Sequence, residues 1–500
     1  MADPFALLPL NLAAHGGTVD GVPASQLVAA GLTLLQRSAP LVRSLAGRRA
    51  AILLPTSPAF LVALAASEGR GAVLVNPLAS ATEVEHQLRD AEVGAVFTSS
   101  ALASRLPPEV TRVLLDDAPR AARVLHQGSS ARDVDLGSHH GLALEGSPTN
   151  PGSEEEAIIV YTSAMAGTPL GAILTHANLL ANARATSGAA QLGASDRALA
   201  LLPFAHLFGL TVSLAAPLVA GGAVSTMARF HPGRAVERLV HERTTLLVGV
   251  PAVYHALLAA LKARANVRES LAALRVCICG GAVLPLELQE RWFDITGVEL
   301  RQGYGLTEAG PVCLFNACDR PNLRGTLGPP LPGVEVTVRS PISWSDAGES
   351  SPPARDDAIP RGEAGEICVR GPNVFRGYVS DGDRGLVVRD GWLHTGDLGR
   401  CDPDGTVVFV GLLKPMFTRS GFNVYPREIE RVVRAMPGVD AVEVRAVPEP
   451  SREHDIHLRV DGDVTEKAVR HWCEERLAVY KRPSHLVVRR RSADPSLRSG

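Results

Sequence analysis

Residues 50–98 read AAILLPTSPAFLVALAASEGRGAVLVNPLASATEVEHQLRDAEVGAVFT, and the pattern of this segment predicts the fold class. Short apolar runs at Ala50–Pro55, Ala72–Pro77 and Val93–Thr98 have the length of buried strands. The segments between them, Pro58–Glu68 and Thr82–Ala91, have the length and composition of helices. Strands that alternate with helices at this spacing predict a parallel, doubly wound sheet of the α/β class.

The same alternation continues along the chain and then gives way to another pattern. Further strand-like and helix-like segments lie at Ala157–Thr162, His176–Ala190, Leu199–Pro203, Leu246–Pro251 and Arg275–Cys279. Residues 340–361 are rich in Ser, Pro and Asp, which predicts an exposed connection. The last part of the chain mixes helix and strand in the manner of a small α+β unit. Because 500 residues exceed what one core supports, we expect a large multi-sheet N-terminal domain and a small C-terminal one.

The composition excludes several classes of function. The chain has 46% hydrophobic residues, 20% charged residues and a formal net charge of −2, which is typical of a globular protein. Nothing in this balance indicates a nucleic-acid-binding surface or a basic membrane anchor. The sequence contains no run of about twenty apolar residues, so we expect no membrane span. The seven cysteines are scattered without a paired framework, which predicts reduced thiols and a cytoplasmic location.

A candidate phosphate-binding loop lies at Ile158–Leu179, which reads IIVYTSAMAGTPLGAILTHANL. We interpret this segment as a strand, a loop and a helix, with Thr162, Ser163 and Gly167 in the loop. Small hydroxyl side chains and free backbone N–H groups at the start of a helix bind phosphate groups. Taken alone, the pattern fits a simple turn between a strand and a helix better than a phosphate site.

Six other segments accompany this loop. They read LPFAHLFG (202–209), VPAVY (250–254), GGAVLP (280–285), QGYGLTE (302–308), GWLHTGDLG (391–399) and SGFNVYPREI (420–429). With these segments in this order, residues 50–500 resemble the adenylate-forming (ANL) superfamily of acyl- and aryl-CoA synthetases, luciferases and adenylation domains. SGFNVYPREIE is most similar to the fatty-acyl- and aryl-CoA branch. The resemblance implies an AMP- and acyl-binding domain of residues 1–411, a hinge at 412–415 and a mobile cap of residues 416–500.

The resemblance also implies roles for individual residues. Tyr304 would stack on adenine, Asp397 would accept hydrogen bonds from the ribose, and Thr307 would contact the α-phosphate. Glu308 would hold Mg²⁺, because a carboxylate beside a phosphate suits a hard cation. His206 would border the reacting carboxylate or thioester, although a buried core histidine is the alternative interpretation.

Other residues are implied in the acyl, CoA and nucleotide sites. Gly281 and Ala282 would leave room for an acyl channel, and Gly421 would let the backbone approach the pantetheine arm of CoA. For each glycine, a simple turn is the alternative. The ligand-binding set is completed by Thr162, Ser163, Gly167, Gly305 and Lys414.

The chain departs from the family in the groups that hold the ATP phosphates. The family loop reads Y-T-S-[GS]-[TS]-T-G-x-P-K-G, whereas residues 161–171 read YTSAMAGTPLG, so Leu170 replaces the lysine. In the hinge, Leu412 stands where the family has arginine, and Pro415 restricts the preceding Lys414 to extended conformations. The family ends in P-x-x-x-x-G-K, and residues 495–500 match it up to the glycine. Because one preorganised donor contributes about 10²–10³ in rate, we expect little adenylation.

Three functions remain open. We place first the transfer of an acyl or aryl group from a CoA thioester to another pantetheine thiol, such as that of an acyl carrier protein, with CoA as the cofactor. We place second the ligation of a carboxylate to CoA with ATP and Mg²⁺, and third a relative that binds a partner without catalysis. Transfer comes first because the losses are confined to phosphate-binding groups, while the adenosine and pantetheine segments are kept.

Overall fold

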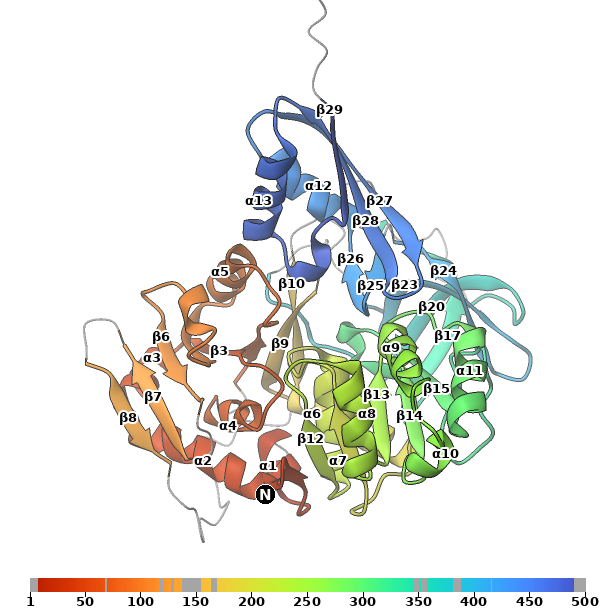
Figure 1. Ribbon diagram of the computed structural model, residues 1–500, viewed down its shortest axis with the longest axis horizontal. Helices are drawn as coiled ribbons and strands as arrows, with labels where there is room; N and C mark the ends of the chain where they lie inside the picture. Colours follow the sequence, from red (N-terminus) through yellow and green to blue (C-terminus); the bar gives the residue numbers. More distant parts are fainter. Residues whose placement is uncertain are drawn as a thin grey trace, which may run out of the picture.

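The computed structural model describes residues 8–67, 70–116, 120–126, 130–136, 154–162, 169–344, 350–351, 358–380, 388–414 and 416–489. Two large sheets and a third, smaller one form the body, and a C-terminal unit lies against one end of it (blue in Figure 1). Helices pack on the two large sheets, and the body contains one large apolar core and a second, smaller one. This arrangement confirms the predicted α/β class with a multi-sheet body and a small α+β unit.

The first large sheet has the strand order β16-β15-β14-β13-β11-β12-β1-β2. In this order, the strands from β15 through β1 are parallel to one another. The strand at each edge of the sheet, β16 at one and β2 at the other, is antiparallel to its neighbour. The strands are, in that order, Val312–Phe315, Leu300–Gly305, Val276–Cys279, Leu246–Gly249, Arg197–Ala200, Ala223–Thr226, Thr18–Val19 and Val22–Pro23. Parallel strands place their carboxyl ends at one edge, where ligands bind in open α/β sheets.

The second large sheet has the strand order β21-β10-β9-β4-β3-β5-β6-β7-β8. Its five central strands, β9 to β6 in this order, run parallel. The strands are, in that order, Gly377–Tyr378, Leu170–Thr175, Glu156–Thr162, Ala72–Leu74, Arg49–Leu53, Val93–Thr98, Thr111–Leu114, Ala121–Leu125 and Arg132–Asp135. The strand–helix alternation quoted from residues 50–98 thus forms the middle of this sheet.

The helices of the body connect and cover these strands. They are α1 (Leu8–Ala13), α2 (Ala24–Arg37), α3 (Ala39–Leu45), α4 (Ala59–Ala66), α5 (Ala81–Asp90), α6 (His176–Ala189), α7 (Ala216–Val219), α8 (Pro232–His241), α9 (Pro251–Leu261), α10 (Val267–Ser270) and α11 (Leu286–Thr296). Helix α4 is apolar on all sides and every residue in it is buried, as expected of a helix that packs inside a domain. Helix α5 begins with a capping box, in which Ser80 and Glu83 exchange side-chain and backbone hydrogen bonds.

The third sheet leads from the body to the C-terminal unit. Its strands are β17 (Glu335–Arg339), β20 (Ala364–Arg370), β23 (Trp392–Cys401) and β22 (Val388–Arg389), with β24 (Val407–Leu412) paired to β23. The C-terminal unit then contains the hairpin β25–β26 (Phe417–Arg419, Phe422–Val424), α12 (Pro426–Arg434), β27 (Val439–Glu449), β28 (Glu453–Gly462), α13 (Glu466–Arg476) and β29 (His485–Arg489). Its residues form an apolar core separate from that of the body. We call this unit the cap; the hinge at 412–415 and the motion of the cap remain predictions.

The structure corrects the interpretation of Ile158–Leu179 as strand, loop and helix. A second strand, β10, follows the loop and pairs antiparallel with β9, so that Leu170 lies opposite Thr162. The residues of β10, LGAILT, are apolar and mostly buried, and no alternation of polar residues marked them as a strand. Helix α6 begins only after this strand, so a strand, and not the expected helix, is the next element of the chain after β9.

Two other expectations can be compared with the fold. The predicted exposed connection at residues 340–361 contains a short ladder between β18 (Ser343–Trp344) and β19 (Ser350–Ser351), so it is not wholly irregular. Within the described ranges, none of the helices combines the length and the apolar character that crossing a bilayer requires.

Candidate active site

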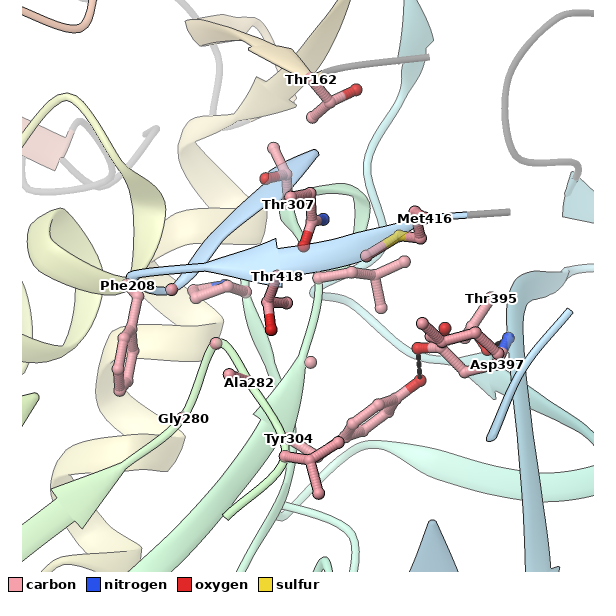
Figure 2. A pocket seen from close by; sticks show the side chains of 18 of the residues that line it. Thr162, Phe208, Gly280, Ala282, Tyr304, Thr307, Thr395, Asp397, Met416 and Thr418 are labelled. Carbon is pink, nitrogen blue, oxygen red and sulfur yellow. Dashed lines mark hydrogen bonds between the residues drawn. The ribbon is translucent and has the colours of Figure 1, made fainter. Parts of the chain in front are cut away.

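A cavity of about 350 Å³ lies where the body meets the cap. Its walls come from β9 and β10, from β15 and the following turn η3 (Thr307–Ala309), from β23 and β24, and from the cap hairpin β25–β26. Figure 2 shows these walls around one open space, with Tyr304 and Asp397 on one side and Phe208 on the other. The cavity is therefore built jointly by both parts of the chain.

The predicted site residues that the structure describes all line this cavity. They are Thr162, His206, Gly281, Ala282, Tyr304, Gly305, Thr307, Glu308, Asp397, Lys414 and Gly421. Ser163 and Gly167 fall outside the described residues. Residues separated by more than two hundred positions in the sequence thus converge, while the role of each one remains a prediction.

Tyr304 and Asp397 form a direct contact at one end of the cavity. Tyr304, near the end of β15, donates its hydroxyl to Asp397 Oδ2 on β23 at 2.7 Å (Figure 2). Burial raises the pKa of Asp397 above its usual value, while the Lys414 cation and the Tyr304 hydroxyl act in the opposite direction. The two strands, which belong to different sheets, are thereby joined through the site.

Lys414 extends along the backbone of β23 inside the cavity. Its Nζ atom donates to the carbonyl of Thr395 at 2.6 Å. A Cβ atom at Gly396 would lie 2.0 Å from Lys414 Cε, so only glycine leaves room for the lysine stem. Burial lowers the pKa of Lys414, and the carboxylates of Asp397 and Glu308 oppose that change. Of the described residues that line the cavity, Lys414 alone is a lysine or an arginine.

Glu308 lies in the cavity wall beside Thr162 of β9 and Tyr378 of β21. It is 6% exposed, and its Oε1 atom accepts hydrogen bonds from the hydroxyls of Thr162 (3.3 Å) and Tyr378 (2.8 Å). Sequence reasoning missed Tyr378, because its position depends on the pairing of β21 with β10 rather than on a local pattern. A carboxylate held by two hydroxyl donors at a cavity wall has the oxygen chemistry that Mg²⁺ prefers.

His206 also lines the cavity and lies just before the π-helix η2 (Phe208–Ala215). Its Nδ1 atom accepts the backbone N–H of Phe208 at 3.2 Å. Burial lowers the pKa of His206 to about 4, so the ring is neutral near pH 7. Because Nδ1 is an acceptor, the proton of the neutral ring is on Nε2. His206 can therefore donate one hydrogen bond to a ligand.

The cap lies close against the body at Gly421. This residue has φ +77°, and a Cβ atom would lie 2.3 Å from Val250 Cγ1, so a glycine is required for both reasons. Next to it, Phe422 meets the ring of His206 edge-on at 6.0 Å between centroids. Sequence reasoning quoted the segment that contains Phe422 but did not assign this residue. It also missed His454, a cap residue in the cavity wall.

Comparison with known proteins agrees with this architecture. A family model described as "AMP-binding enzyme" matches residues 43–379. The chain belongs to that family. It is 34% identical over 454 residues to the feruloyl-CoA synthase of an Amycolatopsis species, covering 88% of this chain and 84% of that protein. The chain is therefore an enzyme of the adenylate-forming fold, related to acyl- and aryl-CoA ligases.

Two solved structures allow a closer comparison of shape. A malonyl-CoA ligase in a product complex with methylmalonyl-CoA and AMP is 27% identical, with a TM-score of 0.77 over 97% of this chain and 98% of that one. ATP-bound MatB from Rhodopseudomonas palustris is 26% identical, with a TM-score of 0.68 over 97% of this chain and 95% of that one. At almost equal identity and coverage, the chain is thus more similar in shape to the product complex.

Proposed function

We propose that the chain is an acyl- or aryl-CoA ligase that works in two steps. In the first, a carboxylate oxygen attacks the α-phosphorus of ATP, which forms an acyl-adenylate and releases pyrophosphate. In the second, the thiol of CoA attacks the acyl carbonyl and releases AMP. The observation that carries this proposal is the single cavity in which Tyr304, Asp397, Glu308 and His206 meet the cap.

The nucleotide end of the cavity fits an adenosine. The ring of Tyr304 offers a flat face for adenine, while its hydroxyl fixes Asp397 at 2.7 Å. Asp397 would accept hydrogen bonds from the ribose hydroxyls through its other carboxylate oxygen. Lys414, which lies against β23 beside Asp397, would add positive charge near the phosphate of the adenylate.

The phosphate end of the cavity fits a metal-bound triphosphate. The Thr307 hydroxyl would contact the α-phosphate, and Glu308 would hold Mg²⁺. Glu308 suits this role because it is nearly buried and is oriented by the hydroxyls of Thr162 and Tyr378. The ion would neutralise charge on the phosphate oxygens. Thr162, Gly305 and the loop residues Ser163 and Gly167 complete the proposed phosphate contacts.

The acyl end of the cavity fits an uncharged carbonyl group. Neutral His206 would donate its Nε2–H to the oxygen of the reacting carboxylate or thioester, where negative charge develops during attack. Gly281 and Ala282 would border the acyl group, since side chains this small leave space beside β14. The pantetheine arm would pass Gly421, where the absence of a side chain keeps the cap close to Val250.

The relatives support ligation over the acyl transfer that the sequence departures placed first. The feruloyl-CoA synthase is similar over nearly the whole chain, and the residues expected to bind AMP line the cavity together. Leu170 and Leu412 still leave two family cations absent. We therefore propose slow adenylation, not its loss. The contact between Phe422 of the cap and the ring of His206 supports a cap placed as for the thiol-dependent step.

The test is a product analysis of the full-length chain. The protein is incubated with Mg²⁺, ATP, CoA and a panel of aryl and fatty acids, and the products are identified by mass. Ligation predicts equal amounts of acyl-CoA and AMP, and no product when ATP is omitted. Acyl-CoA consumption with a second thiol in the absence of ATP would instead support transfer.

A further inference from the structure

Helix α5 of the body is in direct contact with the last part of the cap. The backbone N–H of Val479 donates to the carbonyl of Leu78 at 3.3 Å, just before α5 begins. The Thr82 hydroxyl in the first turn of α5 donates to the carbonyl of Glu475 in α13 at 3.5 Å. These contacts join residues about four hundred positions apart, so they exist only while the cap is docked in this orientation.

A buried lysine lies at the centre of this contact. Lys481 Nζ is 2.8 Å from Glu83 Oε1 on α5 and 2.6 Å from Glu428 Oε1 on α12. The side chains are 3%, 12% and 4% exposed for Lys481, Glu83 and Glu428. A single cation thus bridges one carboxylate of the body and one of the cap. Buried charges of this kind are costly unless each has a partner. Separating the cap from the body removes one of the two partners of Lys481 and is therefore unfavourable.

Lys481 is also connected to the reacting end of the cavity. The ring of the neighbouring Tyr480 stacks on Phe422 with centroids 4.3 Å apart and planes at 16°, and Phe422 meets His206 edge-on. Arg419 of β25 donates to the carbonyls of Tyr480 (3.2 Å) and Arg482 (2.6 Å). The segment that carries Lys481 is therefore fixed to the same hairpin that covers His206.

We propose that Lys481 is a positioning residue for thioester formation, because its bridge to Glu83 locks the cap onto helix α5 and thereby holds Phe422 against His206. The inference rests on the proposed two-step function. Breaking the bridge leaves the residues of the nucleotide end in place, since Tyr304, Asp397 and Glu308 all belong to the body. The thiol-dependent step should therefore be slowed selectively, while adenylation is not.

The bridge is best broken with Glu83→Gln, because this change leaves the pair of Lys481 and Glu428 inside the cap intact. Glu85→Gln is the matched control: Glu85 lies on the same helix, its side chain is 60% exposed, and it pairs only with Arg89 at 3.5 Å among the ion pairs of the described residues.

The thiol-dependent step is measured by supplying a synthetic acyl-adenylate and CoA, and adenylation is measured by ATP–pyrophosphate exchange. We expect the first rate to fall roughly tenfold to a hundredfold in Glu83→Gln, the effect of losing one hydrogen bond to a charged group, with exchange unchanged and Glu85→Gln unaffected.

Docking itself is measured by hydrogen exchange of the Val479 amide, which needs no activity. We expect this amide to exchange roughly tenfold to a hundredfold faster in Glu83→Gln, with the thermal midpoint of the cap unchanged. Equal exchange in Glu83→Gln and the native chain, or equal slowing of both half-reactions, would overturn the inference. If the native chain makes no thioester at all, the proposed function is wrong, and hydrogen exchange alone still decides whether Lys481 locks the cap.

Discussion

The surroundings of His206 hold its ring in one protonation state. Its Nδ1 atom accepts the Phe208 N–H, and burial lowers the pKa of His206 to about 4. The ring therefore has its one proton on Nε2, on the side from which it can donate. From the sequence, His206 could be interpreted as a site residue or a core histidine; the structure shows that it is half-buried and forms part of the cavity wall.

At this scale, we expect the free energy of unfolding to decrease as the pH falls from about 6.5 to about 4. The folded-state pKa of His206 is about 4 and the unfolded-state value is about 6.5. The unfolded chain then binds more protons in this window, so the contribution is complete above the window and is lost as the pH falls through it. His206→Gln should remove this part of the pH dependence, which is at most about 3 kcal/mol. Denaturant titrations at several pH values measure it, and an identical slope in the variant would contradict it.

A second prediction concerns Leu170, which lines the cavity at the start of β10. Leu170→Lys would place a cation near Glu308 and the proposed triphosphate. We expect ATP–pyrophosphate exchange to rise by about 10- to 100-fold, somewhat less than the contribution of a fully preorganised donor. Val410→Lys is the matched control, because it adds the same charge at a position that is 50% exposed. A similar gain in both variants would show that net charge, not position, is responsible.

At the scale of secondary structure, the sequence predicted elements that follow a local pattern. Val93–Thr98 forms β5 as expected, and α5 differs from its prediction by one residue at each end. The elements that were missed depend on tertiary contacts. Strand β10 is apolar on both faces, and β21 exists as a strand because it pairs with β10. For the same reason, the sequence identified Glu308 as a site residue but not Tyr378, its partner from β21.

The hairpin β25–β26 gives a prediction at this scale. Gly421→Ala would add a Cβ atom 2.3 Å from Val250 Cγ1 at φ +77°. We expect thioester formation from acyl-adenylate to fall by at least about tenfold, because the hairpin must move away from the body, while pyrophosphate exchange is retained. Steady-state assays of each half-reaction measure the two effects.

Two further variants separate steric contact at Gly421 from a general effect of replacing a glycine near the junction of body and cap. Gly411→Ala is the control, since a Cβ atom there meets nothing within 4 Å. Val250→Ala combined with Gly421→Ala should restore part of the thiol-dependent rate, because it removes the methyl group that the new Cβ atom would contact. No restoration would mean that the backbone conformation, and not the contact with Val250, is limiting.

At the scale of the whole molecule, the cavity is complete only where body and cap meet. The body supplies Tyr304, Asp397 and Glu308, and the cap supplies Gly421 and His454. The sequence predicted this division from its motifs, but it could not give the orientation of the cap. That orientation depends on contacts such as the one between Lys481 and Glu83, which join segments from opposite ends of the chain.

ATP–pyrophosphate exchange tests the central claim most directly, because it requires the first step alone. The full-length chain is incubated with Mg²⁺, ATP, labelled pyrophosphate and single aryl or fatty acids. Ligation predicts slow exchange that depends on the carboxylate and that Asp397→Ala decreases by about 10²–10³. The absence of exchange with every carboxylate, together with movement of an acyl group from acyl-CoA to a second thiol without ATP, would contradict it.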